Sequence, residues 1–187
     1  MMTPPDRWTC LDSRVLLRRW WMTLRQDRVR LPNGVELDEY HVAEYPDWAA
    51  VLALTDDARA VLVQQYRYGI DRVIWELPAG AVDSDEDVEA AAQRELLEET
   101  GYAAREWHRL GRLAVEPGRH TNYGHLWVAT GCERVAEPTP EEAEDLRVHT
   151  VPAADLPGMV EDGRIAHGVH AAAVFWALAR GFLSEVD

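Results

Sequence analysis

The feature that most constrains this chain is the stretch 84–100, whose residues have the spacing of an amphipathic helix. Acidic residues crowd its first turn, and Ser84 provides an N-terminal capping signal there. Gly101 follows as a C-terminal stop. The apolar side is formed by Val88, Ala92 and Leu96. The stretch therefore predicts a helix that packs one side against a core and presents an acidic side elsewhere.

Three glutamates share that acidic side. Glu95, Glu98 and Glu99 are spaced i, i+3 and i+4, so their carboxylates repel one another unless a cation lies among them. Hard oxygen ligands favour Mg²⁺, Mn²⁺ or Ca²⁺ over zinc. Arg94 lies beside them, and Glu86 is placed to pair with it and hold the preceding loop against the helix. A solvated acidic helix surface is the alternative for an isolated motif of this kind.

Strands are predicted on both sides of this helix. Segments 25–31 and 35–45 are joined by Pro32-Asn33-Gly34, which is typical of a tight hairpin. Further strands are predicted at 15–24, 48–55, 58–67, 108–115, 123–130 and 146–151, and helices at 152–161 and 168–181. The stretch 72–80 is expected to enter a loop at Pro78. Mixed strands with helices before and after them predict a layered α/β sandwich.

Composition excludes several classes of function. The net charge of −14 opposes binding to a nucleic-acid polymer. All 19 basic residues are arginine, which excludes lysine nucleophiles, Schiff bases and P-loops. No apolar run approaches the roughly 20 residues of a membrane-spanning helix. Two cysteines without metal-ligand spacing, and a beginning unlike a secretion signal, lead us to expect a cytoplasmic protein.

The stretch 80–102 matches a longer pattern. It has the form G-x5-E-x7-R-E-U-x-E-E-x-G-U, where U is an apolar residue, and only Tyr102 departs from it mildly by being aromatic. The fixed positions are Gly80, Glu86, Arg94, Glu95, Glu98, Glu99 and Gly101. This pattern resembles the signature of the Nudix hydrolases. The resemblance implies an α/β/α sandwich with a mixed sheet over 48–187, preceded by an antiparallel β appendage over 1–47.

The resemblance also implies a chemistry. In that family the segment with this pattern, called the Nudix box, binds divalent metal, and the enzymes cleave a nucleoside diphosphate linked to another group. A pyrophosphate repels nucleophiles, so its hydrolysis benefits from cations on its oxygens and from a water of lowered pKa. Glu95, Glu98 and Glu99 are the expected ligands, together with the carbonyl of Ala79, and the cation expected is Mg²⁺ or Mn²⁺. Arg94 belongs to the expected catalytic group.

The flanking segments resemble the branch that acts on ADP-ribose and nucleoside diphosphate sugars. Pro117 lies fifteen residues beyond the box, and ELPAG at 76–80 leads into it, as in that branch. Arg67 resembles an arginine that contacts substrate phosphates, although a surface ion pair is an alternative. By the same resemblance Glu142 is the candidate base that deprotonates water, and Glu144 a further metal ligand. A disordered acidic loop is the alternative for these two.

Other residues are candidates by position alone. Trp75 and Glu76 precede the box and are candidates for a base or ribose contact, and Arg119 is placed on a loop suited to a substrate lid. Which tryptophan stacks on a base is left open among Trp20, Trp21, Trp48 and Trp75. The histidines, including His167 and His170, show no metal-ligand spacing, and we expect them to be structural.

We therefore predict a metal-dependent pyrophosphatase that converts ADP-ribose or a similar nucleoside diphosphate sugar to a nucleoside monophosphate and a sugar phosphate. The appendage resembles the part of that branch that builds a homodimer. Two alternatives remain: a Nudix hydrolase of dinucleoside polyphosphates or oxidised nucleotides, and a Nudix sensor that binds a nucleotide without cleaving it. The identity of the sugar, the base and the metal is not fixed by the sequence.

Overall fold

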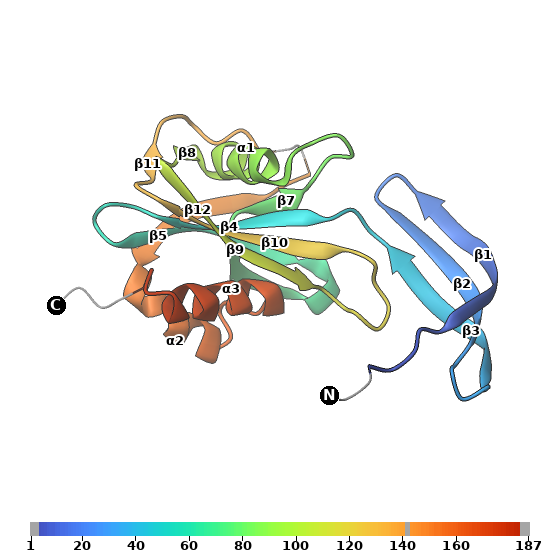
Figure 1. Cartoon of the computed structure of the whole chain (residues 1–187). Coiled ribbons are helices and arrows are strands. Elements are labelled where there is room, and N and C mark those ends of the chain that lie inside the picture. The colour runs from blue at the N-terminus through green and yellow to red at the C-terminus, as the bar shows by residue number, and fades with distance from the viewer. Residues whose placement is uncertain (1–3, 141–142, 184–187) are drawn as a thin grey trace. The chain divides into compact units, whose positions relative to one another are not determined.

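The computed structural model describes residues 4–140 and 143–183. It contains two compact units, each shown in Figure 1. Met1–Pro46 and Ala114–Asn122 form the small unit, and Asp47–Leu113 with Tyr123–Asp187 forms the large unit. The small unit thus takes up a second, later segment of the chain.

The small unit is built on a three-stranded antiparallel sheet in the order β1-β2-β3. Its strands are β1 (Thr9–Arg19), β2 (Met22–Arg30) and β3 (Glu36–Glu44). The predicted antiparallel appendage is confirmed, and so is the hairpin turn, where Gly34 takes a φ of 86°. The single strand predicted over 15–24 is wrong, because the chain turns at Trp20 and Trp21 and leaves their large rings exposed.

The segment Ala114–Asn122 packs against β3. The amide of Ala43 donates to the carbonyl of Arg119 at 2.9 Å, and the amide of Thr121 donates to the carbonyl of Ala43 at 3.3 Å. The hydroxyl of Tyr40 also donates to the carbonyl of Gly118. These bonds tie the predicted lid segment to the small unit's sheet.

The large unit contains a seven-stranded mixed sheet. The path runs β12-β5-β4-β10-β9, with β6 paired to β5 and β7 paired to β4. Its strands are β4 (Trp48–Leu54), β5 (Arg59–Arg67), β6 (Arg72–Glu76), β7 (Ala79–Ala81), β9 (Glu106–Ala114), β10 (Tyr123–Thr130) and β12 (Leu146–Pro152). Strands β4 and β10 are parallel, whereas β5 pairs antiparallel with β4, β6 and β12.

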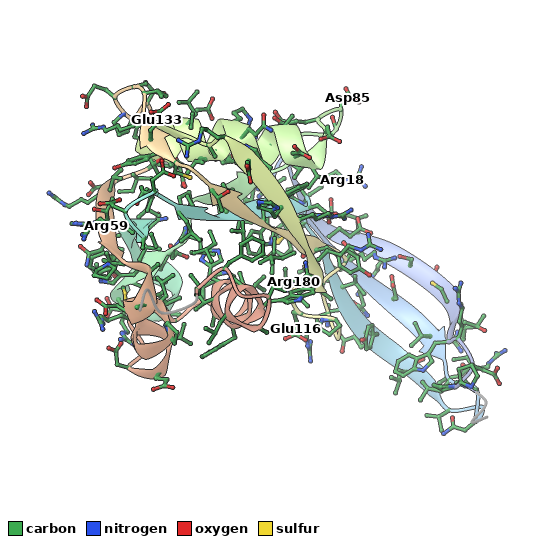
Figure 2. The ribbon with its side chains drawn as sticks, turned by 60° about the vertical axis from the view of Figure 1, so that its left-hand side comes forward. Arg18, Arg59, Asp85, Glu116, Glu133 and Arg180 are labelled. Carbon is green, nitrogen blue, oxygen red and sulfur yellow. The ribbon has the colours of Figure 1, made fainter. Side chains whose placement is uncertain are left out.

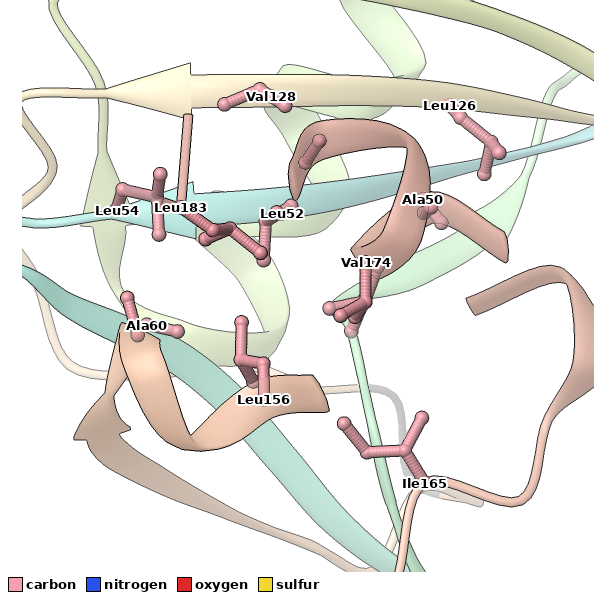
Figure 3. Close-up of a cluster of buried hydrophobic side chains, with 14 of the residues drawn as sticks. Ala50, Leu52, Leu54, Ala60, Leu126, Val128, Leu156, Ile165, Val174 and Leu183 are labelled. Carbon is pink, nitrogen blue, oxygen red and sulfur yellow. The ribbon is translucent and has the colours of Figure 1, made fainter. Parts of the chain in front are cut away.

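Strand β4 is apolar along its whole length because both of its sides are buried. Ala49, Val51 and Ala53 belong to the core cluster that includes Leu96 of the helix α1. Ala50, Leu52 and Leu54 belong to the cluster on the other side, drawn in Figure 3 with Val174 and Ile165. The alternation of a strand thus supplies both cores from one segment.

Helices cover the two sides of this sheet, α1 on one and α2 with α3 on the other (Figure 1). Their bounds are α1 (Val88–Thr100), α2 (Leu156–Glu161) and α3 (Gly168–Ala179), with short 3₁₀ turns at η1 (Tyr68–Ile70) and η2 (Ala153–Asp155). The predicted α/β/α sandwich is confirmed. No helix in the described ranges has the length and apolar character needed to cross a bilayer.

The capping prediction for α1 was wrong by one turn. Asp87 is the N-cap, and its carboxylate accepts from the amides of Glu89 and Ala90, so Ser84 stays in the preceding loop. At the other end, Gly101 has a φ of 73° and donates to the carbonyl of Leu97, as predicted. The short pair β8 (Tyr102–Ala103) and β11 (Glu133–Arg134) follows. Asp85 and Glu133 lie near opposite ends of α1 (Figure 2).

Candidate active site

Helix α1 carries the three predicted glutamates. Glu95 and Glu99 are buried, at 8% and 2% exposure, whereas the side chain of Glu98 is 44% exposed. Two acids of a surface helix therefore lie inside the protein, and burial of that kind costs free energy unless a partner compensates it. The cluster is thus built into the fold, and the solvated-surface alternative does not describe it.

Arg94 is the partner of this cluster. Its Nε and Nη2 donate to the two carboxylate oxygens of Glu86, each at 2.9 Å, and Nη2 also donates to the carbonyl of Ala81 at 3.0 Å. Its Nη1 lies 2.7 Å from Oε1 of Glu95 and 3.1 Å from Oε2 of Glu98. Bidentate pairing of this type is strong, and it raises the pKa of Arg94, chiefly through Glu86. The predicted pairing of Glu86 with Arg94 is present.

Two glycines allow this packing. A Cβ on Gly80 would lie 2.1 Å from the carboxylate of Glu95, so a side chain there would displace that glutamate. A Cβ on Gly101 would lie 2.1 Å from the carbonyl oxygen of Ala136, in addition to the positive φ at that position. Both glycines are therefore required by close contacts, one of them with the acidic cluster itself.

Strand β7 approaches Glu99 through its backbone. The amide of Ala79 donates to Oε2 of Glu99 at 2.9 Å. Burial nevertheless raises the pKa of Glu99 to about 8, and the charges of Glu95 and Glu144 act in the same direction. Burial also raises the pKa of Glu95. These carboxylates are desolvated and mutually repelling, which is the electrostatic environment that a bound cation relieves.

A second polar group lies next to β7. Nε of Arg67 donates to Oε2 of Glu76 at 2.7 Å, and the Glu76 side chain is only 1% exposed. The positive charge of Arg67 opposes the rise in the pKa of Glu99 that burial causes, so the pair acts on the acidic cluster. A cavity of about 170 Å³ adjoins it, lined by Trp48, Arg67, Glu76, Ala79, Gly80, Ala81, His167 and His170.

The donor set suits a hard divalent cation. It consists of the carboxylate oxygens of Glu95, Glu98 and Glu99, and oxygen ligands are those that Mg²⁺ and Mn²⁺ prefer. Within the described ranges, no three His, Cys, Asp or Glu side chains are already gathered as a metal site. In this arrangement Nη1 of Arg94 lies between Glu95 and Glu98. Glu95, Glu98 and Glu99 would hold a cation, which would neutralise their negative charge.

Comparison with known proteins identifies the family. Residues 45–168 match the family described as NUDIX domain. Residues 8–43 match the family described as nucleoside diphosphate sugar hydrolase N-terminal domain. The chain belongs to the Nudix family. The prediction made from the pattern at 80–102 is confirmed, and that segment is the Nudix box below.

Individual relatives extend the comparison. A protein named ADP-ribose pyrophosphatase from Mycobacterium tuberculosis is 34% identical over 85% of this chain and 78% of its own length. A methanol dehydrogenase activator from Bacillus methanolicus is 38% identical over 59% of this chain, and the match spans 60% of that relative. A solved structure titled ADP compounds hydrolase superposes with a TM-score of 0.82 over 96% of this chain and 99% of its own. At 22% identity this last likeness concerns the fold.

The remaining predicted residues fall in different places. Glu142 lies outside the described residues. Glu144 precedes β12. Burial is the largest cause of the raised pKa values of Glu95 and Glu99, and the charge of Glu144 raises both further. Glu144 is therefore within electrostatic reach of the Nudix box. The ring of Trp75 lies 4.8 Å from that of His149 and packs against the core cluster. Neither of these two contacts of Trp75 involves the Nudix box.

Pro117 and Arg119 belong to the small unit. Both are exposed, and the backbone of Arg119 is held by Ala43 of β3 and by the carbonyl of Glu116. Their predicted roles toward a substrate therefore stay predictions.

Two histidines lie at the start of α3. His167 and His170 are expected from the sequence to be structural, and the structure places both on the wall of the cavity beside the Nudix box. Their rings are stacked with centroids 4.2 Å apart, and Trp48 packs edge-on against both. No motif marks them. The only sequence signal was their spacing of three residues at a helix start, which puts both on one side of the helix.

Proposed function

We propose that this Nudix protein hydrolyses the pyrophosphate of ADP-ribose or a related nucleoside diphosphate sugar, releasing a nucleoside monophosphate and a sugar phosphate. The observation that carries the proposal is the complete Nudix box. Two of its carboxylates, those of Glu95 and Glu99, are buried next to β7, which also lines the cavity with Arg67 and Glu76. The match of residues 8–43 to the nucleoside diphosphate sugar hydrolase N-terminal domain supports this substrate class.

Divalent metal is part of the proposal. Glu95, Glu98, Glu99 and the carbonyl of Ala79 would hold Mg²⁺ or Mn²⁺, and Glu144 would contribute to a further ion. When bound, the metal neutralises phosphate charge and lowers the pKa of a water. The burial of Glu95 and Glu99 supports this assignment, because two desolvated acids beside one arginine leave a surplus of negative charge.

Arg94 holds the residues of the Nudix box in place through hydrogen bonds. Its bidentate pair with Glu86 fixes the loop before α1, and its Nη1 orients Glu95 and Glu98. Arg67 is proposed as the phosphate contact. Its guanidinium is 47% exposed while its Nε is held by buried Glu76, so the side chain is oriented without being hidden. A surface ion pair would not have a partner that is 1% exposed.

In the proposed reaction a water oxygen forms a bond to one phosphorus, and the bond from that phosphorus to the bridging oxygen breaks. The leaving phosphate keeps the electron pair, and the water proton passes to a carboxylate base. Glu142 is the candidate for that base by resemblance, and a glutamate of the Nudix box is the alternative. Glu98 is the most exposed of the three box glutamates and is best placed to meet the solvent.

Further parts of the proposal concern assembly and location. Large apolar side chains of the small unit are exposed, notably Val15, Leu16 and Trp20 at 50%, 44% and 95%. A homodimer formed through this unit would cover such residues. Trp75, Pro117 and Arg119 stay predicted substrate contacts. We also propose a cytoplasmic location, which the two free cysteines, Cys10 and Cys132, support.

A substrate panel tests the function. The full chain is incubated with ADP-ribose, other nucleoside diphosphate sugars, dinucleoside polyphosphates and nucleoside triphosphates, with Mg²⁺, with Mn²⁺ or with chelator. Phosphatase coupling then scores the monoester products. We expect metal-dependent cleavage of ADP-ribose or a nucleoside diphosphate sugar. Preference for dinucleoside polyphosphates or oxidised nucleotides would support the alternative enzyme, and tight binding without cleavage would support a sensor.

A further inference from the structure

Two residues that line the cavity beside the Nudix box each have a buried polar atom with unused hydrogen-bonding capacity. Oε1 of Glu76 and Nδ1 of His167 are both buried, and neither has a hydrogen-bond partner among the described residues. Glu76 is 1% exposed, and its other oxygen is already bound by Arg67. Buried polar atoms are normally satisfied, so two such atoms, each on a residue that lines one cavity, need a common explanation.

A second and larger cavity adjoins the first. It has a volume of about 590 Å³ and shares Arg67, Glu76 and His167 with the first. It is lined in addition by Ile74 and by residues of η1 and of the start of α3. Its volume falls within the range of small-molecule sites. Tyr68 and Ile70 on its wall are exposed at 88% and 53%, so the cavity reaches the surface.

The imidazoles in this cavity are held in place. The amide of Leu77 donates to Nδ1 of His170 at 3.3 Å, which fixes that ring. His167 stacks on it, and Trp48 packs against both rings. Burial lowers the pKa of His167 and that of His170, so both are neutral near pH 7. A neutral imidazole nitrogen can donate or accept a hydrogen bond, depending on its tautomer.

We infer that this cavity is the subsite for the sugar attached to the distal phosphate, and that His167 and Glu76 recognise its hydroxyl groups. The inference rests on the proposed function. A carboxylate oxygen accepts hydrogen bonds from hydroxyls, and a neutral imidazole pairs with hydroxyls in either direction. Oε2 of Glu76 is already paired with Arg67, so its Oε1 is left as a hydrogen-bond acceptor, which suits a hydroxyl donor better than a phosphate oxygen. His167 is then a specificity-determining residue.

The position of the cavity agrees with this assignment. Ala79 and Gly80 line it, and the same two residues contact Glu99 and approach Glu95 of the Nudix box. A ligand in the cavity is therefore next to the group that would hold the pyrophosphate. The sugar is the hydroxyl-rich part of the proposed substrate that lies immediately beyond the pyrophosphate.

Paired substrates test the inference. His167→Ala and wild type are compared on ADP-ribose and on the methyl ester of ADP, which keeps the pyrophosphate but has no distal sugar. We expect kcat/KM to fall by about 10- to 100-fold for ADP-ribose, the worth of a buried hydrogen bond. We expect the value for the methyl ester to change less than about twofold. Equal losses on both substrates would overturn the subsite.

Binding provides a readout without turnover. The inhibition constant of ribose 5-phosphate should rise about tenfold or more in His167→Ala, whereas that of AMP should be unchanged. His167→Gln keeps a polar group at the same place and should recover part of the loss. His108→Ala is the matched control, since its side chain is 39% exposed on β9. A structural role for His167 would instead lower thermal stability and raise both inhibition constants together, without rescue by Gln.

The outcomes separate the two proposals. If wild type cleaves ADP-ribose and His167→Ala cleaves it equally well, the function stands and the subsite fails. If wild type cleaves none of the panel, the proposed function fails, and calorimetric titration with ribose 5-phosphate still tests the cavity. A further comparison uses nucleoside diphosphate riboses that carry other bases and the same sugar. If His167→Ala changes the preference for ADP-ribose over these substrates, the cavity recognises the base, and the sugar assignment is wrong.

Discussion

Nη1 of Arg94 lies 2.7 Å from Glu95 and 3.1 Å from Glu98, so one N–H group holds together two carboxylates that metal would also hold. The guanidinium therefore stabilises the Nudix box when no cation is present. The same group fixes Glu86, so the loop before α1 and the acidic side of the helix depend on one side chain.

Arg94→Ala should destabilise the metal-free protein, because it leaves partly buried carboxylates without their partner. We expect a loss of about 1–3 kcal/mol in the free energy of unfolding, measured in urea with chelator. The gain in melting temperature on adding Mg²⁺ should be larger than in wild type, since more repulsion remains to be relieved. Arg134→Ala, which breaks an exposed pair with Glu137, is the control and should cost less than about 1 kcal/mol.

Glu98→Gln and Glu99→Gln should each reduce turnover by several orders of magnitude while the fold is kept, because each would remove a charged ligand of the proposed metal. Initial rates at saturating Mg²⁺ measure the effect, and circular dichroism checks the fold. Glu89→Gln changes an acid in the first turn of the same helix and should leave rates unchanged. Near wild-type turnover in both box variants would remove the metal assignment.

Stability of the metal-free protein should fall as pH rises. The pKa of Glu99 is raised from an ordinary 4.5 to about 8, so between these values the folded state binds more protons than the unfolded state. The stabilising contribution is complete below pH 4.5 and is lost as pH rises through about 8. Urea unfolding with chelator from pH 5 to 8 measures the slope. Glu99→Gln should flatten it, and an equal slope in that variant would contradict the assignment.

Much of this arrangement could be predicted from the sequence because the signals are local. The spacing of Glu95, Glu98 and Glu99 fixes their common side on α1, and Gly101 marks the helix end through a conformation that glycine favours. The alternating burial of β4 follows from its continuous apolar run. Each of these depends on neighbours within a few residues.

What the sequence could not predict depends on tertiary contacts. Ser84 and Asp87 are both good caps, and only the packing of the loop by Glu86 and Arg94 decides between them. Residues 15–24 are predicted to form one strand because large apolar rings favour strands. The sequence does not show that the rings of Trp20 and Trp21 are exposed at a turn. The position of His167 on the cavity wall likewise depends on how the start of α3 packs, which no local pattern shows.

Replacing exposed apolar residues of β1 and of the turn after it should weaken the proposed dimer. The double variant Leu16→Asp with Trp20→Asp puts charge where a partner copy would bury apolar surface. Light scattering across a concentration series should show a dimer for wild type and a monomer for the variant. Asp6→Asn, at an exposed position of the same unit, is the control. A wild-type chain that is monomeric at all concentrations would remove the dimer from the proposal.

The water-activating base is the sharpest prediction that remains. The box explains how metal is held, and Glu142 is the residue that resemblance nominates for the proton. Glu142→Gln should lower kcat by about 10²–10⁴, the usual worth of general base catalysis, with little change in KM or metal affinity.

Glu144→Gln should behave differently from Glu142→Gln. Its charge already acts on Glu95 and Glu99, so its removal should raise the Mg²⁺ concentration needed for half-maximal rate and leave the rate at saturating metal nearer to wild type. Steady-state kinetics over Mg²⁺ and pH separate the two variants. If Glu142→Gln keeps full kcat and a substitution at Glu98 or Glu99 shifts the pH profile instead, the base lies within the Nudix box, and the segment around Glu142 is only a connection to β12.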